Sequence, residues 1–265
     1  MKQWTALQIK NSKGRQRLAC LTAYDAGMAR LLDEAGIPLI LVGDSVANTM
    51  LGHATTLPVT LEQMLHHTAA VARGVAGALV VGDMPFMSYQ AGDDQAVRNA
   101  GRFLQEAGAD AVKLEGGRLR AGLIRRLVDN GIPVMGHLGL TPQSVLALGG
   151  YKVQGRQPEA AAALMADAEA LDQAGVFSIV LECVPAALAQ EITAAVSVPT
   201  IGIGAGSACD GQILVLHDLL GLTPPGATAK FVKRYAELGA AVSQAVHQYQ
   251  SEVESGAFPA PEQSY

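Results

Sequence analysis

The chain has 265 residues, of which 49% are hydrophobic and 16% charged, and its formal net charge is −5 at pH 7. This composition excludes a disordered chain and is sufficient for a large hydrophobic core. No basic cluster is longer than Arg125-Arg126, which argues against nucleic acid or an anionic membrane surface as the main partner. The composition therefore favours small-molecule substrates.

The N-terminal residues and the cysteines indicate the cellular compartment in which we expect the protein. Residues 1–17 are mostly polar and basic, so we expect neither a secretory signal nor a membrane anchor. The three cysteines, Cys20, Cys183 and Cys209, cannot all pair within one chain and form no CxxC motif. These observations predict a reduced protein in the cytoplasm.

A short helix or arm is expected over residues 1–17, and after it one unit repeats along the chain. The unit is an apolar strand, a helix and a sharp helix end at glycine, as in Glu34-Ala35-Gly36. Strands are expected to start near Leu18, Pro38, Ala78, Asp110, Ile132, Phe177, Val198 and Ile213. After the first helix, over residues 26–35, the expected helices cover residues 61–73, 94–107, 118–129, 158–174, 186–196 and 229–254.

Eight strands that alternate with helices predict an α/β protein with a closed (β/α)8 TIM barrel. Such a barrel needs about 250 residues, so residues 1–265 are expected to form a single domain, with the short N-terminal arm and a flexible C-terminal tail over about 256–265. A doubly wound open sheet is the alternative, because periodicity does not reveal whether a sheet closes. Two long segments, 45–60 and 139–157, follow strands and would lie at the catalytic face of a barrel.

Five of the predicted strands end in an ionisable residue. These residues are Asp44, Asp83, Glu115, His137 and Glu182. The carboxyl ends of barrel strands meet at one pocket, so these side chains are expected to be neighbours. Clustered carboxylates repel one another unless a cation lies among them, and oxygen ligands without a Cys or His pair favour Mg²⁺ or Mn²⁺ over zinc. The alternative is that each acidic residue caps the helix that follows it.

Lys113 stands two residues before Glu115 and therefore faces the same side of the strand. A lysine inside a barrel needs negative charge nearby. It either binds a substrate carboxylate or oxyanion or forms a structural ion pair with an aspartate, and a Schiff-base role is a weaker alternative.

Glu182 and His137 are candidates for acid–base chemistry. Glu182 directly follows an apolar strand, a setting that suits a general base, and helix capping is the alternative. His137 is expected either to donate a hydrogen bond to a substrate oxygen, to support the residues that touch the substrate, or to be a core histidine held by the backbone.

Motifs along most of the chain resemble one family. They include Leu21-Thr22-Ala23-Tyr24-Asp25, Val42-Gly43-Asp44-Ser45, Val112-Lys113-Leu114-Glu115-Gly116-Gly117, Gly136-His137-Leu138-Gly139-Leu140-Thr141-Pro142-Gln143 and Leu181-Glu182-Cys183-Val184-Pro185. From about Leu18 to Tyr235 the sequence resembles the ketopantoate hydroxymethyltransferase family. The resemblance implies a (β/α)8 barrel and the first committed step of pantothenate synthesis, on the route to coenzyme A.

The reaction implied by the resemblance moves a one-carbon unit from 5,10-methylenetetrahydrofolate to 3-methyl-2-oxobutanoate and gives ketopantoate. By the same resemblance, the Mg²⁺ ligands are Asp44, Asp83 and Glu115, the residues that contact the keto acid are Asp44, Ser45, Asp83 and Lys113, and the proton acceptor is Glu182. The family also implies a homo-oligomer, commonly a homodecamer. At Ala54 many relatives carry Asp, a departure that concerns a detail of the loop.

The chemistry of the candidate residues agrees with this reaction, because a base beside a divalent cation can form an enolate from a keto acid. A carbon–carbon lyase on a similar Mg²⁺ barrel would use the same enolate in reverse. A barrel that binds a 2-oxo acid without catalysis is the alternative from another class. Tetrahydrofolate-dependent turnover distinguishes the three.

Overall fold

The computed structural model describes residues 2–224 and 228–265. The chain divides into two compact units, Met1–Val215 and Leu216–Tyr265. The expectation of a single domain with a flexible tail over 256–265 stays a prediction. Within the described residues, no helix is long and apolar enough to cross a membrane.

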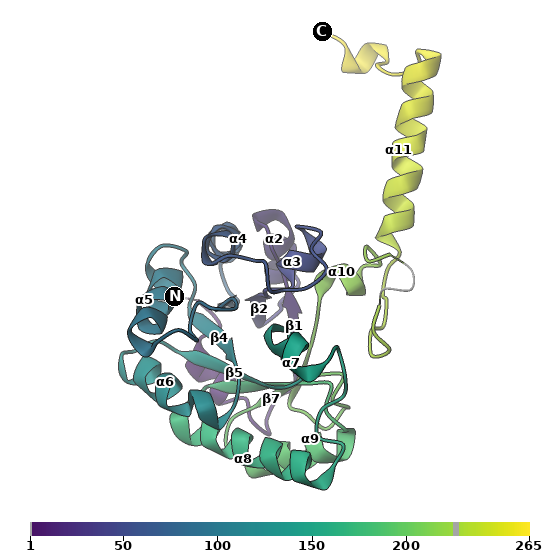
Figure 1. Cartoon of the computed structure of the whole chain (residues 1–265). Helices are drawn as coiled ribbons and strands as arrows, with labels where there is room; N and C mark the ends of the chain where they lie inside the picture. Colours follow the sequence, from purple (N-terminus) through teal and green to yellow (C-terminus); the bar gives the residue numbers. More distant parts are fainter. Residues whose placement is uncertain (1, 225–227) are drawn as a thin grey trace. The chain divides into compact units, whose positions relative to one another are not determined.

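The first unit contains a closed barrel of parallel strands arranged in the order of the sequence (Figure 1). The strands are β1 (Leu18–Thr22), β2 (Leu39–Val42), β3 (Leu79–Asp83), β4 (Ala111–Glu115), β5 (Val134–Gly139), β6 (Ser178–Glu182), β7 (Thr200–Ile203) and β8 (Gly211–Leu214). Pairing of β8 with β1 closes the ring, with Leu18 opposite Gly211. This closure confirms the (β/α)8 barrel and excludes the open doubly wound sheet.

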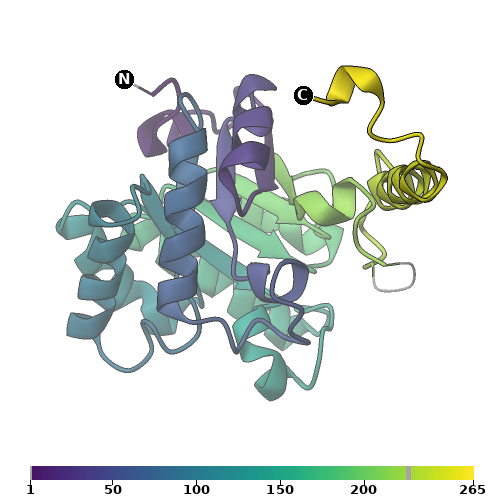
Figure 2. The ribbon, with the colours of Figure 1, turned by 90° about the horizontal axis from the view of Figure 1, so that it is seen from above.

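The longer helices of this unit lie outside the ring of strands (Figures 1 and 2). In chain order the helices are α1 (Ala6–Lys10), α2 (Ala26–Glu34), α3 (Val46–Thr49), α4 (Leu61–Gly74), α5 (Asp93–Gln105), α6 (Arg118–Asp129), the 3-10 helix η1 (Pro142–Ser144), α7 (Val145–Leu148), α8 (Pro158–Ala174) and α9 (Ala186–Ala195). Local sequence sets their ends. Thr60 and Gln63 form a capping box at the start of α4, and Gly175, with φ +95°, ends α8.

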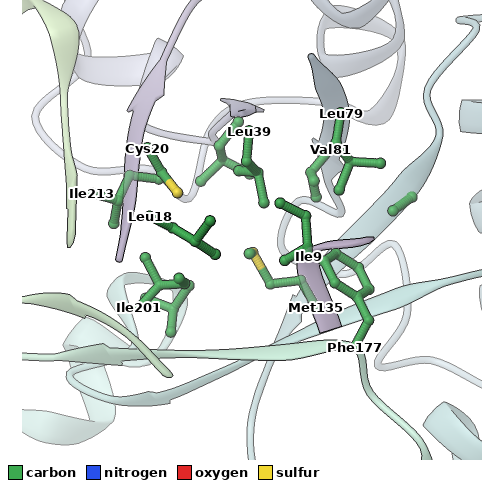
Figure 3. Packing of buried hydrophobic residues seen from close by; sticks show 13 residues of the cluster. Ile9, Leu18, Cys20, Leu39, Leu79, Val81, Met135, Phe177, Ile201 and Ile213 are labelled. Carbon is green, nitrogen blue, oxygen red and sulfur yellow. The ribbon is translucent and has the colours of Figure 1, made fainter. Parts of the chain in front are cut away.

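The interior of the barrel changes from apolar to charged along the strands. Ile9 of α1 packs among apolar side chains that the strands direct inward (Figure 3). On β3, Val81 belongs to this core and Asp83 follows two residues later on the same face; on β4, Ala111 belongs to the core and Lys113 follows in the same way. The strand period therefore carries charged side chains into the carboxyl-terminal layers of the same interior.

The eighth strand begins at Gly211, two residues before the predicted start at Ile213. A β-carbon on Gly211 would lie 2.6 Å from the Leu18 carbonyl oxygen. The missing side chain permits this close approach of two strands, so a residue typical of turns begins a strand here.

The second unit contains α10 (Leu216–Leu219), α11 (Leu238–Ser255) and the 3-10 helix η2 (Pro261–Gln263). The helix predicted over 229–254 is therefore wrong in its first part. The amides of Tyr235 and Leu238 donate to the carbonyls of Leu219 and Leu220, at 2.8 and 2.9 Å, instead of to carbonyls four residues earlier. Hydrogen bonds to the end of α10 and the residue after it thus take the place of the first turns of the expected helix.

Candidate active site

The ionisable residues predicted at the strand ends do come together. Asp83, Glu115 and Glu182 are the last residues of β3, β4 and β6, Asp44 lies two residues beyond β2, and His137 lies in β5. All are buried except Glu182, whose side chain keeps 17% of its exposure. The group therefore forms a cluster of charged side chains at the carboxyl end of the barrel, with Glu182 at its more accessible side.

Strand register adds Lys113 to this group. Lys113 on β4 lies opposite Asp83 on β3, and its Nζ is 2.9 Å from Asp83 Oδ1, with both side chains almost fully buried. Burial lowers the pKa of Lys113, but the charges of Asp83, Glu115 and Asp44 raise it more, so its pKa lies above the usual range. The three carboxylates thus favour the charged form of the Lys113 ammonium among them.

The surroundings of Asp44 and Asp83 disfavour the charged form of their carboxyl groups. Burial, and after it the charges of Asp83 and Glu115, raise the pKa of Asp44 well above its ordinary value, against the lowering effect of Lys113. Burial also raises the pKa of Asp83, although Lys113 opposes it. The Asp44 main-chain N–H donates to Asp83 Oδ2 at 3.0 Å. The Lys113 ammonium, this backbone amide and the Gln143 side-chain amide, which donates to Asp44 Oδ2 at 3.0 Å, thus compensate the anions only in part.

His137 connects the carboxylate cluster with Glu182. Its Nε2 lies 3.2 Å from Glu182 Oε2, and its Nδ1 lies 3.2 Å from Lys113 Nζ and 3.5 Å from Glu115 Oε1. Burial and the Lys113 charge lower the pKa of His137, but its contacts with Glu115 and Glu182 raise it to about 9. A neutral imidazole that accepts from the ammonium at Nδ1 carries its proton on Nε2, and an imidazolium carries one there too. In both forms Nε2 carries a proton near Glu182 Oε2, although the two atoms do not have the geometry of a hydrogen bond.

Ser45 lies at the edge of this group. Its Oγ is 2.8 Å from the hydroxyl of Tyr24, a residue that follows β1, and the side chain is partly buried. Tyr24 thus holds the hydroxyl of the residue that follows Asp44 in the sequence.

Two residues that contact this cluster were missed by reasoning from the sequence. Gln143 of η1 contacts both Asp44 and Glu115, and Tyr89, in the loop after β3, contacts Gln143 and Glu115. Both occur in loops with several other polar residues. No feature of a single sequence marks these two, because their partners lie on other strands.

The three carboxylates proposed as metal ligands have the donor atoms and the charge that suit a divalent cation, but they do not stand in the geometry of a metal site. Asp44, Asp83 and Glu115 offer oxygen ligands, carry more negative charge than Lys113 and His137 offset, and include a buried atom, Glu115 Oε1, without a hydrogen bond. These features suit a hard divalent cation. In the part of the chain that is described, however, no three His, Cys, Asp or Glu side chains stand in the geometry of a metal site. The ligand set stays a prediction.

Comparisons with known proteins place the chain in a family. The family model described as Ketopantoate hydroxymethyltransferase matches residues 3–261. The 3-methyl-2-oxobutanoate hydroxymethyltransferase of Syntrophus aciditrophicus is 57% identical over 253 residues, 96% of this chain and 93% of that protein. The enzyme of the same name from Syntrophomonas wolfei is 53% identical over 266 residues, 100% of this chain and 96% of its own.

Solved structures extend the comparison at the level of the fold. A 2,3-dimethylmalate lyase of the PEP mutase/isocitrate lyase superfamily has a TM-score of 0.62 at 17% identity, covering 97% of this chain and 92% of its own. A phosphonopyruvate hydrolase in complex with oxalate and Mg²⁺ has a TM-score of 0.64 at 14% identity, covering 99% of this chain and 93% of its own. At such low identity these likenesses show a shared barrel.

Proposed function

The chain belongs to the ketopantoate hydroxymethyltransferase family, and from that premise we propose that its reaction uses Mg²⁺ and 5,10-methylenetetrahydrofolate to convert 3-methyl-2-oxobutanoate to ketopantoate at the charged cluster at the carboxyl end of the barrel. The observation that carries the proposal is the cluster itself. It combines three buried carboxylates, a buried lysine and a more accessible glutamate that touches a histidine.

Asp44, Asp83 and Glu115 would hold the cation. Bound Mg²⁺ would supply a Lewis acid that stabilises the negative charge of the enolate. The same residues without a cation leave an excess of buried negative charge, which is costly. The carboxylate cluster needs positive charge, and the reaction needs a cation that stabilises the enolate, so Mg²⁺ would meet both needs.

Lys113 and Ser45 would bind and orient the keto acid. The Lys113 ammonium remains charged because three carboxylates surround it, so it can pair with a substrate carboxylate or with the developing enolate oxygen. The Ser45 hydroxyl, positioned by Tyr24, offers a hydrogen bond at the same edge. Asp44 and Asp83 would contact the keto acid beside the cation.

Glu182 would accept the proton from C3 of the keto acid. Its carboxylate is the most exposed of the cluster, so a substrate can reach it. Its Oε2 lies 3.2 Å from His137 Nε2, and a hydrogen bond formed there in the substrate complex would orient the carboxylate. The nucleophilic C3 would then bond to the methylene carbon of the folate, and both bonds from that carbon to folate nitrogens would break. Water would supply the hydroxyl group, and the proton taken from C3 and the second proton of the water would go to the two nitrogens.

Proton exchange tests the base without the folate. With Mg²⁺ and deuterated solvent, the protein should exchange the C3 proton of 3-methyl-2-oxobutanoate, a reaction followed by NMR. Glu182→Gln keeps the size of the side chain but cannot accept the proton. We expect exchange to slow by about 10² to 10⁴-fold, the effect of losing a general base, while binding of the keto acid in calorimetry persists.

Glu191→Gln is the matched control, because Glu191 is an exposed residue of α9 and the chemical change is the same. Its exchange rate should equal that of the unmodified protein. Exchange by Glu182→Gln at the unmodified rate would remove Glu182 as the base. Turnover that does not depend on tetrahydrofolate would contradict the proposed co-substrate.

Assembly and compartment complete the proposal. By its family we expect a homo-oligomer, specifically a homodecamer, that acts in the cytoplasm on small-molecule substrates. Sedimentation velocity of the purified protein tests the first point, since a decamer and a dimer differ fivefold in mass.

A further inference from the structure

Gln143 is a buried, uncharged residue that contacts two of the three carboxylates from outside the strands. Its main-chain N–H donates to Glu115 Oε2 at 3.1 Å, and its side-chain Nε2 donates to Asp44 Oδ2 at 3.0 Å. The second hydrogen of Nε2 goes to the Met84 carbonyl oxygen at 2.9 Å. One residue of η1 thereby links the ends of β2, β3 and β4.

The orientation of the Gln143 amide is determined by Tyr89. The Tyr89 hydroxyl accepts from the Glu115 main-chain N–H at 3.1 Å, so its own proton is available to an acceptor. Gln143 Oε1 lies 2.7 Å from the hydroxyl, whereas the Glu115 carbonyl lies 3.4 Å away. Gln90 Nε2 also donates to Oε1, at 3.2 Å. A flipped amide would direct its oxygen at the Asp44 carboxylate, so only one orientation satisfies every partner.

These contacts follow a pattern across the cluster. Each carboxylate has one oxygen bound by an amide N–H: Asp44 Oδ2 and Glu115 Oε2 by Gln143, and Asp83 Oδ2 by the Asp44 main chain. Gln143 contacts only one oxygen of each of its two partners. Such contacts fix the rotation of a carboxylate and leave its other oxygen for a ligand.

We propose that Gln143 is a positioning residue, which orients the carboxylates of Asp44 and Glu115 for a divalent cation and is itself oriented by the Tyr89 hydroxyl. The inference rests on the proposed metal site. It adds a role for the loop after β5, which brings one glutamine to the carboxylates of two other strands.

The test measures cation binding by the metal-free protein without substrate. Mn²⁺ serves as the probe, followed by electron paramagnetic resonance or calorimetry. Gln143→Met keeps the length of the side chain and the main-chain N–H but cannot hold Asp44, and we expect the Mn²⁺ dissociation constant to rise about 10 to 100-fold, as for other residues that orient metal ligands. Tyr89→Phe should raise it in the same direction by a smaller factor, because the amide keeps its donors and loses the group that orients it.

Ser144→Ala is the matched control, since Ser144 is an exposed residue of the same 3-10 helix, and its dissociation constant should not change. Thermal unfolding of each metal-free variant identifies a merely structural effect, which would lower the unfolding temperature without altering Mn²⁺ affinity. If Gln143→Met does not fold, Tyr89→Phe decides the question by the same measurement. Dissociation constants for both variants within about twofold of the unmodified value would overturn the inference.

A second comparison separates this inference from the proposed metal site. Asp83→Asn should abolish Mn²⁺ binding if the carboxylates are the ligands. If the unmodified protein binds Mn²⁺ and Asp83→Asn does not, normal binding by both Gln143→Met and Tyr89→Phe would overturn the role of Gln143 alone. Unmodified protein that binds no Mn²⁺ would overturn both.

Discussion

Gly139 is the last residue of β5, and adding one methyl group there, by the substitution Gly139→Ala, should displace Glu182, the proposed base. The residue has φ +92°, and a β-carbon there would lie 2.2 Å from the Glu182 carbonyl oxygen and 2.6 Å from Val184 Cγ2. Real β-carbons do not approach other heavy atoms within 3.0 Å. The substitution Gly139→Ala therefore requires a displacement of at least about 0.8 Å between the ends of β5 and β6.

The energetic cost has two parts. A non-glycine residue in the left-handed region costs about 1–2 kcal/mol, and forcing an additional carbon into a packed site costs about 1–3 kcal/mol. Movement of the colliding backbone also moves Glu182, whose carbonyl accepts the Leu140 N–H at 2.8 Å. We therefore expect Gly139→Ala to lose about 2–5 kcal/mol of unfolding free energy. It should also exchange the C3 proton about 10²-fold more slowly, the usual effect of a misplacement near 1 Å.

Gly131→Ala supplies the matched control. Gly131 has φ +79°, and no heavy atom lies within 4 Å of the position that an added β-carbon would take, so its substitution carries the conformational cost without the collision. Urea unfolding gives the stability of both variants, and deuterium exchange of the keto acid gives the rate. Equal stability losses for the two variants, or a normal exchange rate in Gly139→Ala, would refute the reasoning.

Three further outcomes are expected. Asp83→Ala should abolish Mg²⁺-dependent keto-acid binding in calorimetry with the circular dichroism spectrum retained, and unchanged binding would remove Asp83 from the site. Lys113→Ala should weaken the keto acid more than the folate, and equal losses of the two affinities would favour a structural ion pair with Asp83. Asp33 accepts from the amides of Ala76, Gly77 and Ala78, which lower its pKa against the effect of burial. Its contribution to stability is present above the unfolded pKa of about 4 and lost as the pH falls toward the lower folded value, so Asp33→Asn should reduce the acid dependence of urea unfolding.

The local sequence pattern was sufficient to predict most of the helices and strands. The helices α6 (Arg118–Asp129) and α8 (Pro158–Ala174) have the predicted bounds, because helical periodicity and a glycine or asparagine–glycine end are local signals. The prediction failed at the start of α11, where the amides of Tyr235 and Leu238 bond to Leu219, the last residue of α10, and to Leu220, which follows it. Such contacts join segments about 16 to 18 residues apart, beyond the range of a helical pattern.

The sequence by itself determined that charged residues stand at the ends of apolar strands, and the period of two placed Lys113 and Glu115 on one face. It did not determine which charges pair, since Lys113 had several possible partners before Asp83 was found at 2.9 Å. Closure of the sheet also required the structure, because the pairing of Leu18 with Gly211 joins the two ends of the barrel. Gln143 and Asp44 are 99 positions apart and make contact only because the folded barrel brings their loops together. Periodicity records the face on which a side chain lies, whereas its partners depend on distances between segments, which the tertiary structure alone decides.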